Sequence, residues 1–496
     1  MKLLLIIPHQ KVTYKPSIDL PLGVLSIAGY LRAKDWDGTV EVYDTRLSGK
    51  VHKDADGVDI FGDTSKEIEG RIKAFQPDVV GISNMFSFQI GQALAVADIA
   101  KKACPQAVTV LGGPHASSFP TEMIAHENID YVVMGEGEIR LGELLQSIRK
   151  REKPSIQGVI GGVEDLSLLR SSKKTPIRFF EPLDDLAFPA YDKVDVERYF
   201  HLQSSGFSSR PRKFGKRTVT MLTSRGCPHQ CVFCSVQTTM GYKWRHHSPD
   251  YVKRHIEHLI ADYRIDYIHF QDDNFTHDPD RYDAILDVLL ALERPLRWDT
   301  PNGVRGDSWT HERISKTKAS GCQYLIVAIE SGVQRVIDEV VKKRLDLSQV
   351  DDFMQACKAE KLRCYAFYVI GLPGETEKEI VQTIDYALKK FKDFDVLPTI
   401  HKVTALPGTE LFEIVLNNNY YDHELEYKMN QIVTDEFNPE IIDREYNRFL
   451  SKLIFAIIKK VLFQPGQMVI FLKLVIGYRW FMFDLLKGTI KGVVGR

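Results

Sequence analysis

Hydrophobic and polar residues alternate along the first 150 positions with two periods, one typical of strands and one typical of helices. Short apolar runs cover residues 3–7, 40–43, 79–83, 109–111 and 131–134. Apolar residues at helical spacing lie between them, at residues 22–33, 68–75 and 89–104. Strands that alternate with helices predict a parallel sheet with right-handed crossovers. We therefore predict a doubly wound, Rossmann-like α/β domain over residues 1–150.

The turns after these predicted strands carry small or polar residues. A doubly wound sheet binds its ligand at the carboxyl ends of its strands, where these turns lie. The candidate ligand-binding residues of this domain are Pro8, Ser83, Asn84, Gly112, Gly113, His115, Gly135 and Glu136. The glycines among them allow a bulky ligand to approach the backbone closely.

A second series of strand–helix repeats covers residues 217–410. Its strand candidates lie at residues 218–222, 267–270, 296–300, 324–328, 365–369 and 400–404. Between the two series, residues 151–216 have weak periodicity, a glycine-rich stretch and a proline-punctuated stretch. We predict that residues 151–216 form an ordered linker packed across both domains.

Three closely spaced cysteines provide the clearest candidate chemistry. Cys227, Cys231 and Cys234 have the spacing CxxxCxxC. Three thiolates can hold three irons of a cubane cluster and leave the fourth iron open for chemistry. A zinc site would need a fourth Cys or His ligand, and His229 between two of the cysteines is too constrained to be an obvious one. Seven cysteines without an even-numbered framework do not indicate a secreted disulfide scaffold.

The cysteine spacing, with Phe233 directly before the last cysteine, resembles the radical S-adenosylmethionine (radical SAM) superfamily. The resemblance implies a partial (β/α)6 barrel and a [4Fe–4S] cluster whose open iron binds the methionine part of SAM. It also implies reductive cleavage of SAM to a 5'-deoxyadenosyl radical, with a reductant such as flavodoxin or ferredoxin. An oxygen-sensitive cluster favours a reducing cytoplasm.

Polar residues after the second and third barrel strands resemble SAM-binding positions of this superfamily. Asp272 and Asp273 would accept hydrogen bonds from the amino group of SAM, with a helix N-cap at Asp273 or Asn274 as the alternative. Arg305 would pair with the SAM carboxylate or a substrate acid, or would bridge barrel helices.

The fourth and fifth barrel strands are also followed by segments that resemble the family. Glu330 would accept both ribose hydroxyls of SAM, with an internal salt bridge as the alternative, and Ser331 belongs to the same segment. Gly371 permits close passage of the adenine. In this order after CxxxCxxC, the segments are far more specific than any one of them alone.

The N-terminal domain resembles the cobalamin-binding domain of one large radical SAM subfamily. The resemblance rests on the helix start at residues 21–25 and the turns at residues 112–115 and 135–138. It implies that the turn residues named above bind cobalamin. The motif Asp-x-His-x-x-Gly, which supplies a cobalt ligand in other cobalamin proteins, is absent. The domain is then expected to bind cobalamin without that imidazole, or to have lost the cofactor and only brace the barrel. His9 and His115 could face cobalt or be loop histidines with backbone partners.

Composition and charge add a prediction for the C-terminal region, residues 411–496, which has a helical pattern. The formal net charge of −1 and a hydrophobic share of 44% give no sign of disorder or nucleic-acid binding. The N-terminal apolar run is too short for a signal peptide. Residues 452–496 combine eight basic residues and one acid with apolar stretches shorter than the ~18 residues of a membrane span. Such a segment suits an anionic membrane surface or a lipid substrate, or simply caps the barrel.

The resemblance predicts a cobalamin-dependent radical SAM enzyme that methylates an unactivated carbon of a hydrophobic or natural-product small molecule. An oxidative cyclase or rearrangement enzyme that uses cobalamin is the alternative within the superfamily. A non-catalytic cobalamin or redox sensor is the alternative of another class, which the three intact cysteines disfavour. A methylthiotransferase is disfavoured because only Cys104 lies in the N-terminal domain.

Overall fold

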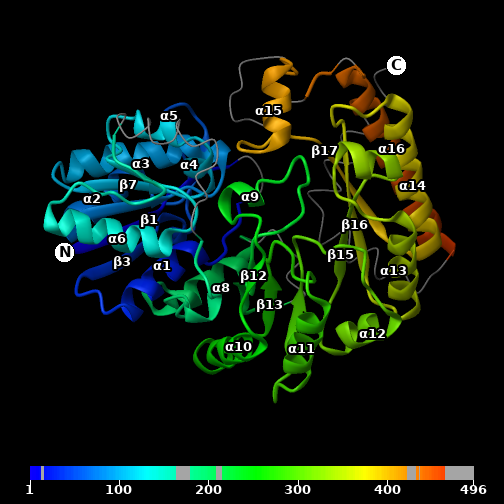
Figure 1. The fold of residues 1–496 in the computed structure, drawn as a ribbon, viewed down its shortest axis with the longest axis horizontal. Helices are drawn as coiled ribbons and strands as arrows, with labels where there is room; N and C mark the ends of the chain where they lie inside the picture. The colour runs from blue at the N-terminus through cyan, green and yellow to red at the C-terminus, as the bar shows by residue number, and fades with distance from the viewer. Residues whose placement is uncertain (13–15, 163–178, 208–214, 422–431, 435, 464–496) are drawn as a thin grey trace.

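The computed structural model describes residues 1–12, 16–162, 179–207, 215–421, 432–434 and 436–463. Two α/β regions lie side by side, one blue to cyan and one green to yellow in Figure 1. Short helices and loops of both regions meet along the face between them.

The first region is built on a six-stranded sheet. In order across the sheet, its strands are β3 (Thr39–Asp44), β1 (Lys2–Ile7), β6 (Val79–Ser83), β7 (Val108–Gly112), β8 (Tyr131–Val133) and β9 (Val159–Ile160). All neighbours are parallel except β9, which pairs antiparallel with β8. The strand order reverses at β1, which creates the switch point at which doubly wound sheets bind ligands.

Helices cover both faces of this sheet, and each face has its own apolar core. One core involves α1 (Leu22–Ala33) and α6 (Gly137–Lys150), and the other involves α2 (Ser65–Phe75) and α3 (Ile90–Ala103). Strand β1 contributes to both cores because alternate residues point to opposite faces. The predicted doubly wound fold is confirmed.

Smaller elements complete the first region. A separate antiparallel sheet consists of β2 (Gln10–Lys11), β5 (Asp59–Phe61) and β4 (Val51–Lys53). Two short helices follow β7, namely α4 (Pro114–Ser118) and α5 (Pro120–Ile124). The 3₁₀ helices η1 (Thr45–Ser48) and η2 (Ser87–Gln89) follow β3 and β6.

The segment predicted as a linker has structure of its own. It contributes β9 to the first sheet, the 3₁₀ helices η4 (Leu183–Asp185) and η5 (Tyr191–Lys193), and helix α8 (Val196–Ser205). Tyr191 and Tyr199 are fully buried and belong to the core of the second region. These described parts therefore connect the two regions by packing, and the domain limits at residues 150, 216 and 410 stay predictions.

The second region has six parallel strands in sequence order, in two sheets of three. The strands are β10 (Thr218–Met221), β13 (Tyr267–Phe270), β14 (Arg297–Asp299), β15 (Leu325–Glu330), β16 (Cys364–Ile370) and β17 (Leu397–Lys402). Parallel bridges from Trp298 to Cys322 and from Val304 to Val327 join the two sheets. Among the described residues no pairing connects β17 to β10, so the six strands form the predicted partial barrel.

Helices follow the barrel strands and cover its outside. They are α10 (Pro249–Tyr263), α11 (Pro279–Leu290), α12 (His311–Ala319), α13 (Leu347–Ala359) and α14 (Glu377–Phe394). After β10, the chain forms the two-residue strand β11 (Ser224–Arg225), the cysteine loop, helix α9 (Val236–Thr239) and strand β12 (Arg245–His246), which pairs antiparallel with β11.

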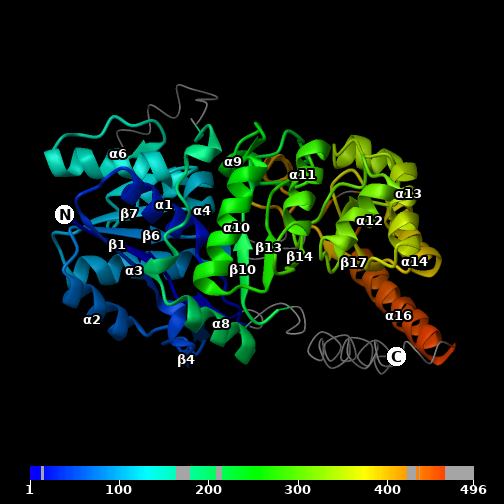
Figure 2. The same cartoon turned by 90° about the horizontal axis from the view of Figure 1, so that it is seen from below.

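Two further helices follow the barrel, α15 (Glu410–Asn417) and α16 (Pro439–Phe463). Helix α16 packs against α14, buries Ile442 and Phe449 in the core of the second region, and forms an ion pair between Arg448 and Asp385. Figure 2 shows α16 extending beyond the barrel. Within the described ranges, no helix has the length and apolar character needed to cross a bilayer. Residues 464–496, most of the predicted basic segment, lie outside the described residues.

Candidate active site between the two α/β regions

The three cysteines of the CxxxCxxC loop differ from the other four in their surroundings. Cys227, Cys231 and Cys234 are half-buried, whereas the remaining cysteines are buried in the cores, and all seven are free of disulfides. Burial raises the pKa of all three thiols, that of Cys234 to about 12. A bound metal deprotonates such thiols outright.

The donor set of this loop fits a cubane cluster. Three thiols within eight residues of one loop supply the three protein ligands that a cluster with one open iron needs. Among the described residues, no three His, Cys, Asp or Glu side chains converge on a single-ion site. The thiols of a cubane cluster bind different irons, so they need not converge in that way.

Backbone hydrogen bonds from several elements fix the loop. The Gly226 amide donates to Asp273, and the Cys227 amide donates to the Gly241 carbonyl at 3.3 Å. Gly226 has a φ of +84°, and a Cβ there would lie 2.4 Å from the Lys243 carbonyl oxygen. This position therefore requires glycine.

A π-helix supports the middle of the loop. Residues Val336–Val340 form the π-helix η6, which follows β15. The residue after it, Val341, accepts a 3.0 Å hydrogen bond from the Val232 amide. The Val232 carbonyl in turn accepts from the Leu411 amide at 2.9 Å. Phe233 is half-buried in the apolar cluster around Val336, so its packing holds the loop as well.

The two aspartates after β13 lie directly beneath this loop. The buried carboxylate of Asp272 accepts hydrogen bonds from the hydroxyls of Thr223 and Ser224, each at 2.6 Å. Asp273 accepts from the Gly226 amide at 2.9 Å, and burial raises its pKa to about 6. The alternative of a helix cap at Asp273 or Asn274 fails, because Asp278 caps the next helix. Both aspartates hold the entry to the cysteine loop, and contact with SAM stays a prediction.

Asn274, expected from the sequence only as a candidate helix cap, contacts the cysteine loop. Its side-chain amide donates to the Cys227 sulfur at 3.8 Å, and its backbone carbonyl accepts from the Trp244 indole at 3.0 Å. Hydrogen bonds to sulfur tune iron–sulfur centres. The signal was its place directly after the two aspartates.

Glu330 lies at a strained position at the end of β15. Its φ is +74°, and the pairing of β15 with β16 shifts register between Ala328 and Glu330. The buried carboxylate accepts a 2.7 Å hydrogen bond from the buried Lys343 ammonium. The salt-bridge alternative is therefore present, and a ribose contact by the second carboxylate oxygen stays a prediction. Lys343 was missed because its partner is 13 residues away in sequence.

Arg305 braces the same area. Its guanidinium forks onto the Asp307 carboxylate, with a shortest distance of 2.7 Å, and donates to the Lys343 carbonyl at 3.1 Å. The structure therefore shows a bridge between two barrel loops rather than between barrel helices, and contact with SAM or a substrate acid stays a prediction. Ser331 shares a 2.8 Å hydrogen bond with Thr383, which ties the end of β15 to α14.

The turn after β16 combines a glycine with a buried acid. Gly371 has a φ of +90°, and its amide and that of Leu372 both donate to Glu375 at 2.8 Å. Glu375 is fully buried, and burial raises its pKa to about 8. This carboxyl shapes the turn at which the adenine is predicted to pass.

The predicted cobalamin residues lie at the carboxyl edge of the first sheet, after β1, β6, β7 and β8. Gly113 has a φ of +110°, and a Cβ there would lie 2.2 Å from the Asn84 carbonyl oxygen. The Asn84 amide nitrogen Nδ2 is buried without a protein acceptor among the described residues. A tightly apposed glycine turn with an unused buried donor fits a large polar ligand such as the corrin ring.

Both candidate cobalt-facing histidines are packed into the first region. His9 is buried, and its Nδ1 lies 3.0 Å from the Asp63 carbonyl oxygen. His115 is 1% exposed and packs with its ring centroid 5.2 Å from that of Phe119. Burial lowers the pKa of His115 to about 4. Their environments are those of loop and core histidines.

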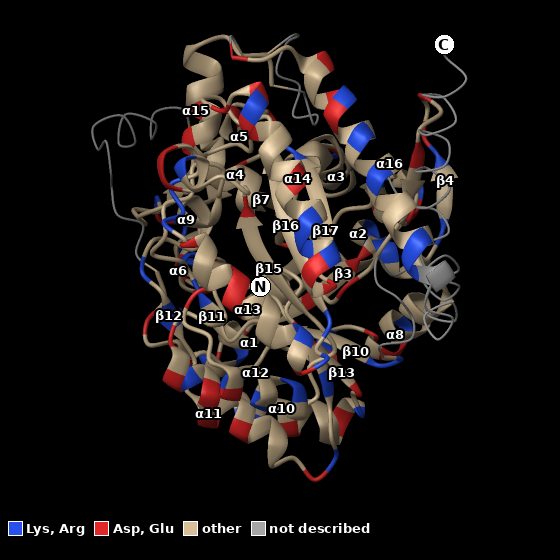
Figure 3. Cartoon of the chain, turned by 90° about the vertical axis from the view of Figure 1, so that its right-hand side faces the viewer, with Lys and Arg blue, Asp and Glu red and all other residues tan. Residues whose placement is uncertain are grey.

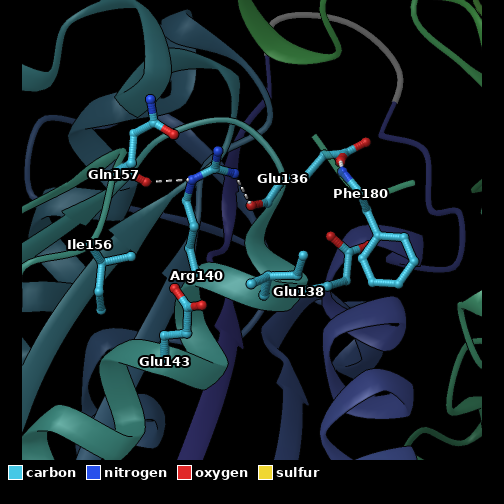
Figure 4. Close-up of a pocket in the computed structure, with 8 residues that line it drawn as sticks. Glu136, Glu138, Arg140, Glu143, Ile156, Gln157 and Phe180 are labelled. Carbon is cyan, nitrogen blue, oxygen red and sulfur yellow. Dashed lines mark hydrogen bonds between the residues drawn. The ribbon is translucent and has the colours of Figure 1, made fainter. Parts of the chain in front are cut away.

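Glu136 lies in a buried ionic cluster between the two regions, together with Glu138, Arg225 and Arg245. Glu136 Oε1 is 2.9 Å from Arg245 and 3.1 Å from Arg225, and Glu138 is 2.8 Å from Arg225. Figure 4 shows the two carboxylates beside a cavity of about 140 Å³. The cavity is lined by the first region and the linker, and none of the three cysteines lines it.

Comparison with known proteins supports two parts of the chain separately. Residues 221–387 match the Radical SAM superfamily, and residues 18–145 match the B12 binding domain. The chain is 30% identical over 438 residues to cytidylyl-2-hydroxyethylphosphonate methyltransferase of Streptomyces wedmorensis, covering 82% of this chain and 80% of the relative. It is 24% identical over 451 residues to the anaerobic magnesium-protoporphyrin IX monomethyl ester cyclase of Rubrivivax gelatinosus, covering 88% and 74%.

A solved structure has the same fold. The radical S-adenosylmethionine methyltransferase TsrM of Kitasatospora setae, with cobalamin and a [4Fe–4S] cluster bound, superposes with a TM-score of 0.66 at 17% identity. The superposition covers 90% of this chain and 85% of TsrM.

Proposed function

The chain belongs to the cobalamin-dependent branch of the radical SAM superfamily, and on that premise we propose that it methylates an unactivated carbon of a hydrophobic small molecule. The cofactors of this family are a [4Fe–4S] cluster, SAM and cobalamin. A small-molecule substrate and an external reductant such as flavodoxin or ferredoxin accompany this chemistry.

The observation that carries the proposal is the contact between the two carboxyl edges. Helix α4, after β7 of the first sheet, packs against α9 directly after the cysteine loop. The Ser118 hydroxyl of α4 donates to the Pro407 carbonyl after β17 at 3.3 Å. Ligands bind at the carboxyl edges of both architectures, so the two cofactor sites would face one shared space.

Each set of residues has a separate task in this scheme. When bound, the cluster would reduce SAM to give the deoxyadenosyl radical that abstracts hydrogen from the substrate, and cobalamin would carry the methyl group. Asp272 and Asp273 hold the cysteine loop in place, while Glu330 and Gly371 shape the predicted SAM site. Asn84 and Gly113 would accommodate the corrin at the opposite edge.

Side chains on the inner face of the barrel support a hydrophobic substrate. Along β16, half-buried Tyr365, Phe367 and Val369 alternate with buried residues that pack against the outer helices. Tyr365 and Phe367 belong to an apolar cluster with Tyr267 of β13, which places them on the inner face. Tyr267 and Tyr365 lie near the amino ends of their strands, so Phe367 and Val369, nearer the carboxyl end of β16, are the apolar side chains that would meet a substrate.

Anaerobic reconstitution tests the proposal. With SAM, cobalamin and dithionite, the full chain should form 5'-deoxyadenosine, and methyl transfer should form S-adenosylhomocysteine as well. A Cys231→Ala protein serves as the background. No 5'-deoxyadenosine above that background would reject catalysis and leave the sensor alternative.

An oxidative cyclase is the second candidate, because the chain is 24% identical to an anaerobic cyclase over 88% of its length. A cyclase would form 5'-deoxyadenosine in the presence of its substrate without S-adenosylhomocysteine. The ratio of the two products therefore decides between the candidates.

We also propose that the C-terminal region contacts an anionic membrane surface. Near the end of α16, Phe455 and Ile458 are 69% and 42% exposed, and Lys452 and Lys459 are exposed on the same helix. Figure 3 shows Lys and Arg recurring along α16. Exposed aromatic and aliphatic side chains beside lysines suit the boundary of an anionic bilayer.

A further inference from the structure

Two acids of the first region and two arginines of the second form the buried cluster described above. Glu136, Glu138, Arg225 and Arg245 are each at most 9% exposed. The Arg225 guanidinium lies 3.1 Å from the Glu136 carboxylate and 2.8 Å from the Glu138 carboxylate. Arg245 donates to both carboxylate oxygens of Glu136. The Ser26 hydroxyl donates to Glu138 at 2.7 Å. The cluster therefore draws partners from both regions, and Arg245 Nε is its one buried nitrogen without an acceptor among the described residues.

The four residues stand at informative points of the sequence. Arg225 lies two residues before Cys227, and it pairs across the β11–β12 ladder with Arg245. Glu136 and Glu138 lie at the start of α6, directly after the glycine turn at the carboxyl edge of the first sheet. The cluster thus joins the cysteine loop to the predicted corrin-binding edge through side chains alone.

Further contacts between the regions lie on the other side of the cysteine loop. After Cys234, helix α9 packs against α4 of the first region. The Thr238 hydroxyl of α9 donates to the Gly408 carbonyl at 2.8 Å, in the same turn that accepts from Ser118. The loop is therefore flanked at both ends by contacts that involve the first region.

A buried ion pair is a weak source of stability, because desolvation of the charges offsets their attraction. Its better-attested use is to fix one arrangement of the groups that carry it, since either charge without its partner is costly. Burial would raise the pKa of Glu138, but the charge and hydrogen bond of Arg225 hold it below its ordinary value. Both groups are therefore charged at neutral pH.

We propose that Arg225 and Glu138 are positioning residues that lock the cysteine loop to the corrin-binding edge, so that loss of their contact loosens both segments. This inference rests on the proposed function, because only then do the two segments hold the two cofactors. The mechanical coupling itself concerns only residues of this chain. Its sharpest consequence is that a substitution in the first region loosens a loop of the second.

Hydrogen exchange of the full chain tests this consequence. Glu138→Gln should speed amide exchange in residues 223–234 by at least about tenfold, although the substituted residue lies in the other region. Arg225→Lys keeps the charge but cannot reach both carboxylates, so we expect a smaller increase. Arg46→Gln is the matched control, because Arg46 is also 10% exposed at its side chain and pairs with Asp44 within the first region.

Unchanged exchange in residues 223–234 of Glu138→Gln, with faster exchange confined to α6, would overturn the proposal. Should Glu138→Gln fail to fold, the same decision falls on Arg225→Lys, with loosening of α6 as the expected reciprocal effect. An equal effect of Arg46→Gln would also overturn it, because general destabilisation would then explain the result.

A second measurement addresses the loaded protein. With iron and cobalamin contents matched, pulsed EPR of the reduced cluster and cob(II)alamin reports the distribution of distances between them. We expect a single narrow distribution in the wild type and in Arg46→Gln, and a broader one in Glu138→Gln. A wild type that forms no methylated product but keeps this pattern would reject the proposed function and leave the coupling intact.

Discussion

The two α/β regions present their candidate sites in opposite ways. In the first sheet the predicted site consists largely of glycine turns and backbone, with Gly113 in contact with the Asn84 carbonyl. In the barrel the predicted site consists of buried charged side chains that already have protein partners, such as Glu330 with Lys343. The first site should therefore be sensitive to added volume and the second to lost charge.

Removal of a cluster ligand should have the largest effect. Cys227→Ala, Cys231→Ala and Cys234→Ala should each lose the cluster and reduce 5'-deoxyadenosine formation at least about a thousandfold, because SAM cleavage needs the reduced iron centre. Cys104→Ala is the control, since Cys104 is buried in the core of the first region. Iron content and product are measured by chemical assay and chromatography. Normal 5'-deoxyadenosine formation by Cys231→Ala would contradict a role of the cluster in SAM cleavage.

Added volume in the first sheet should affect cobalamin alone. Gly113→Val would place its Cβ 2.2 Å from the Asn84 carbonyl oxygen at a φ of +110°, so the turn must move. We expect cobalamin affinity to fall about a hundredfold, a loss of ~2.7 kcal/mol, with iron content unchanged. Gly23→Ala in α1, where a Cβ meets nothing within 4 Å, should bind normally. Loss of iron as well as cobalamin in Gly113→Val would contradict the expectation that the two sites respond to different changes.

Lost charge in the barrel should reduce stability strongly. Lys343→Met leaves the buried Glu330 carboxylate without its partner, which should lower the free energy of unfolding by about 3 kcal/mol. Adding Glu330→Gln should recover part of that loss, because the uncompensated charge is then gone. Denaturant unfolding of the single and double variants measures the difference. Additive losses in the double variant would show that the pair is not coupled.

Glu375 should give stability a pH dependence. Its folded pKa of about 8 is raised above its ordinary value of 4.5 by burial, so between these values the folded state holds a proton that the unfolded state has lost. The free energy of unfolding should therefore fall as pH rises through this window, by up to ~1.4 kcal/mol per pH unit. Glu375→Gln should remove this slope. Thermal unfolding at a series of pH values measures the stability of both proteins. The same dependence on pH in the wild type and in Glu375→Gln would contradict the raised pKa.

Substitution on the exposed face of α16 should have the smallest effect on the fold. Phe455→Ser with Ile458→Ser should change the free energy of unfolding by less than about 0.5 kcal/mol, since both side chains are exposed. The same protein should bind less to vesicles that contain phosphatidylglycerol, measured by co-sedimentation. Equal binding to purely zwitterionic vesicles by the wild type would contradict an electrostatic membrane surface.

The architecture was predictable where burial dictates the pattern. Strand β1 is buried on both faces, so it reads as a continuous apolar run of strand length. Strand β9 was not predicted because two residues at an antiparallel edge leave no periodicity to detect. The site followed the same division. The cysteines carry a local motif, whereas Lys343 and Asn274 act through contacts that only the folded chain brings together.

The ionic cluster between the regions shows why the predicted roles of single residues were incomplete. Glu136 was predicted from its turn to bind cobalamin, and nothing local indicates that Arg225 and Arg245 approach it from the other region. Sequence spacing places a residue on an edge of a sheet but not opposite a partner more than 80 positions away.

The number of residues in the π-helix Val336–Val340 determines which backbone carbonyl faces the cysteine loop. A π-turn accommodates one residue more than the α-helical turn from which it derives. Deleting one residue there would restore an ordinary turn and rotate the following carbonyls by about 100° around the helix axis. The Val341 carbonyl would then no longer face the Val232 amide of the cysteine loop. A relative that lacks this extra residue would need another acceptor for Val232, so the alignment gap itself would report how its cluster loop is held.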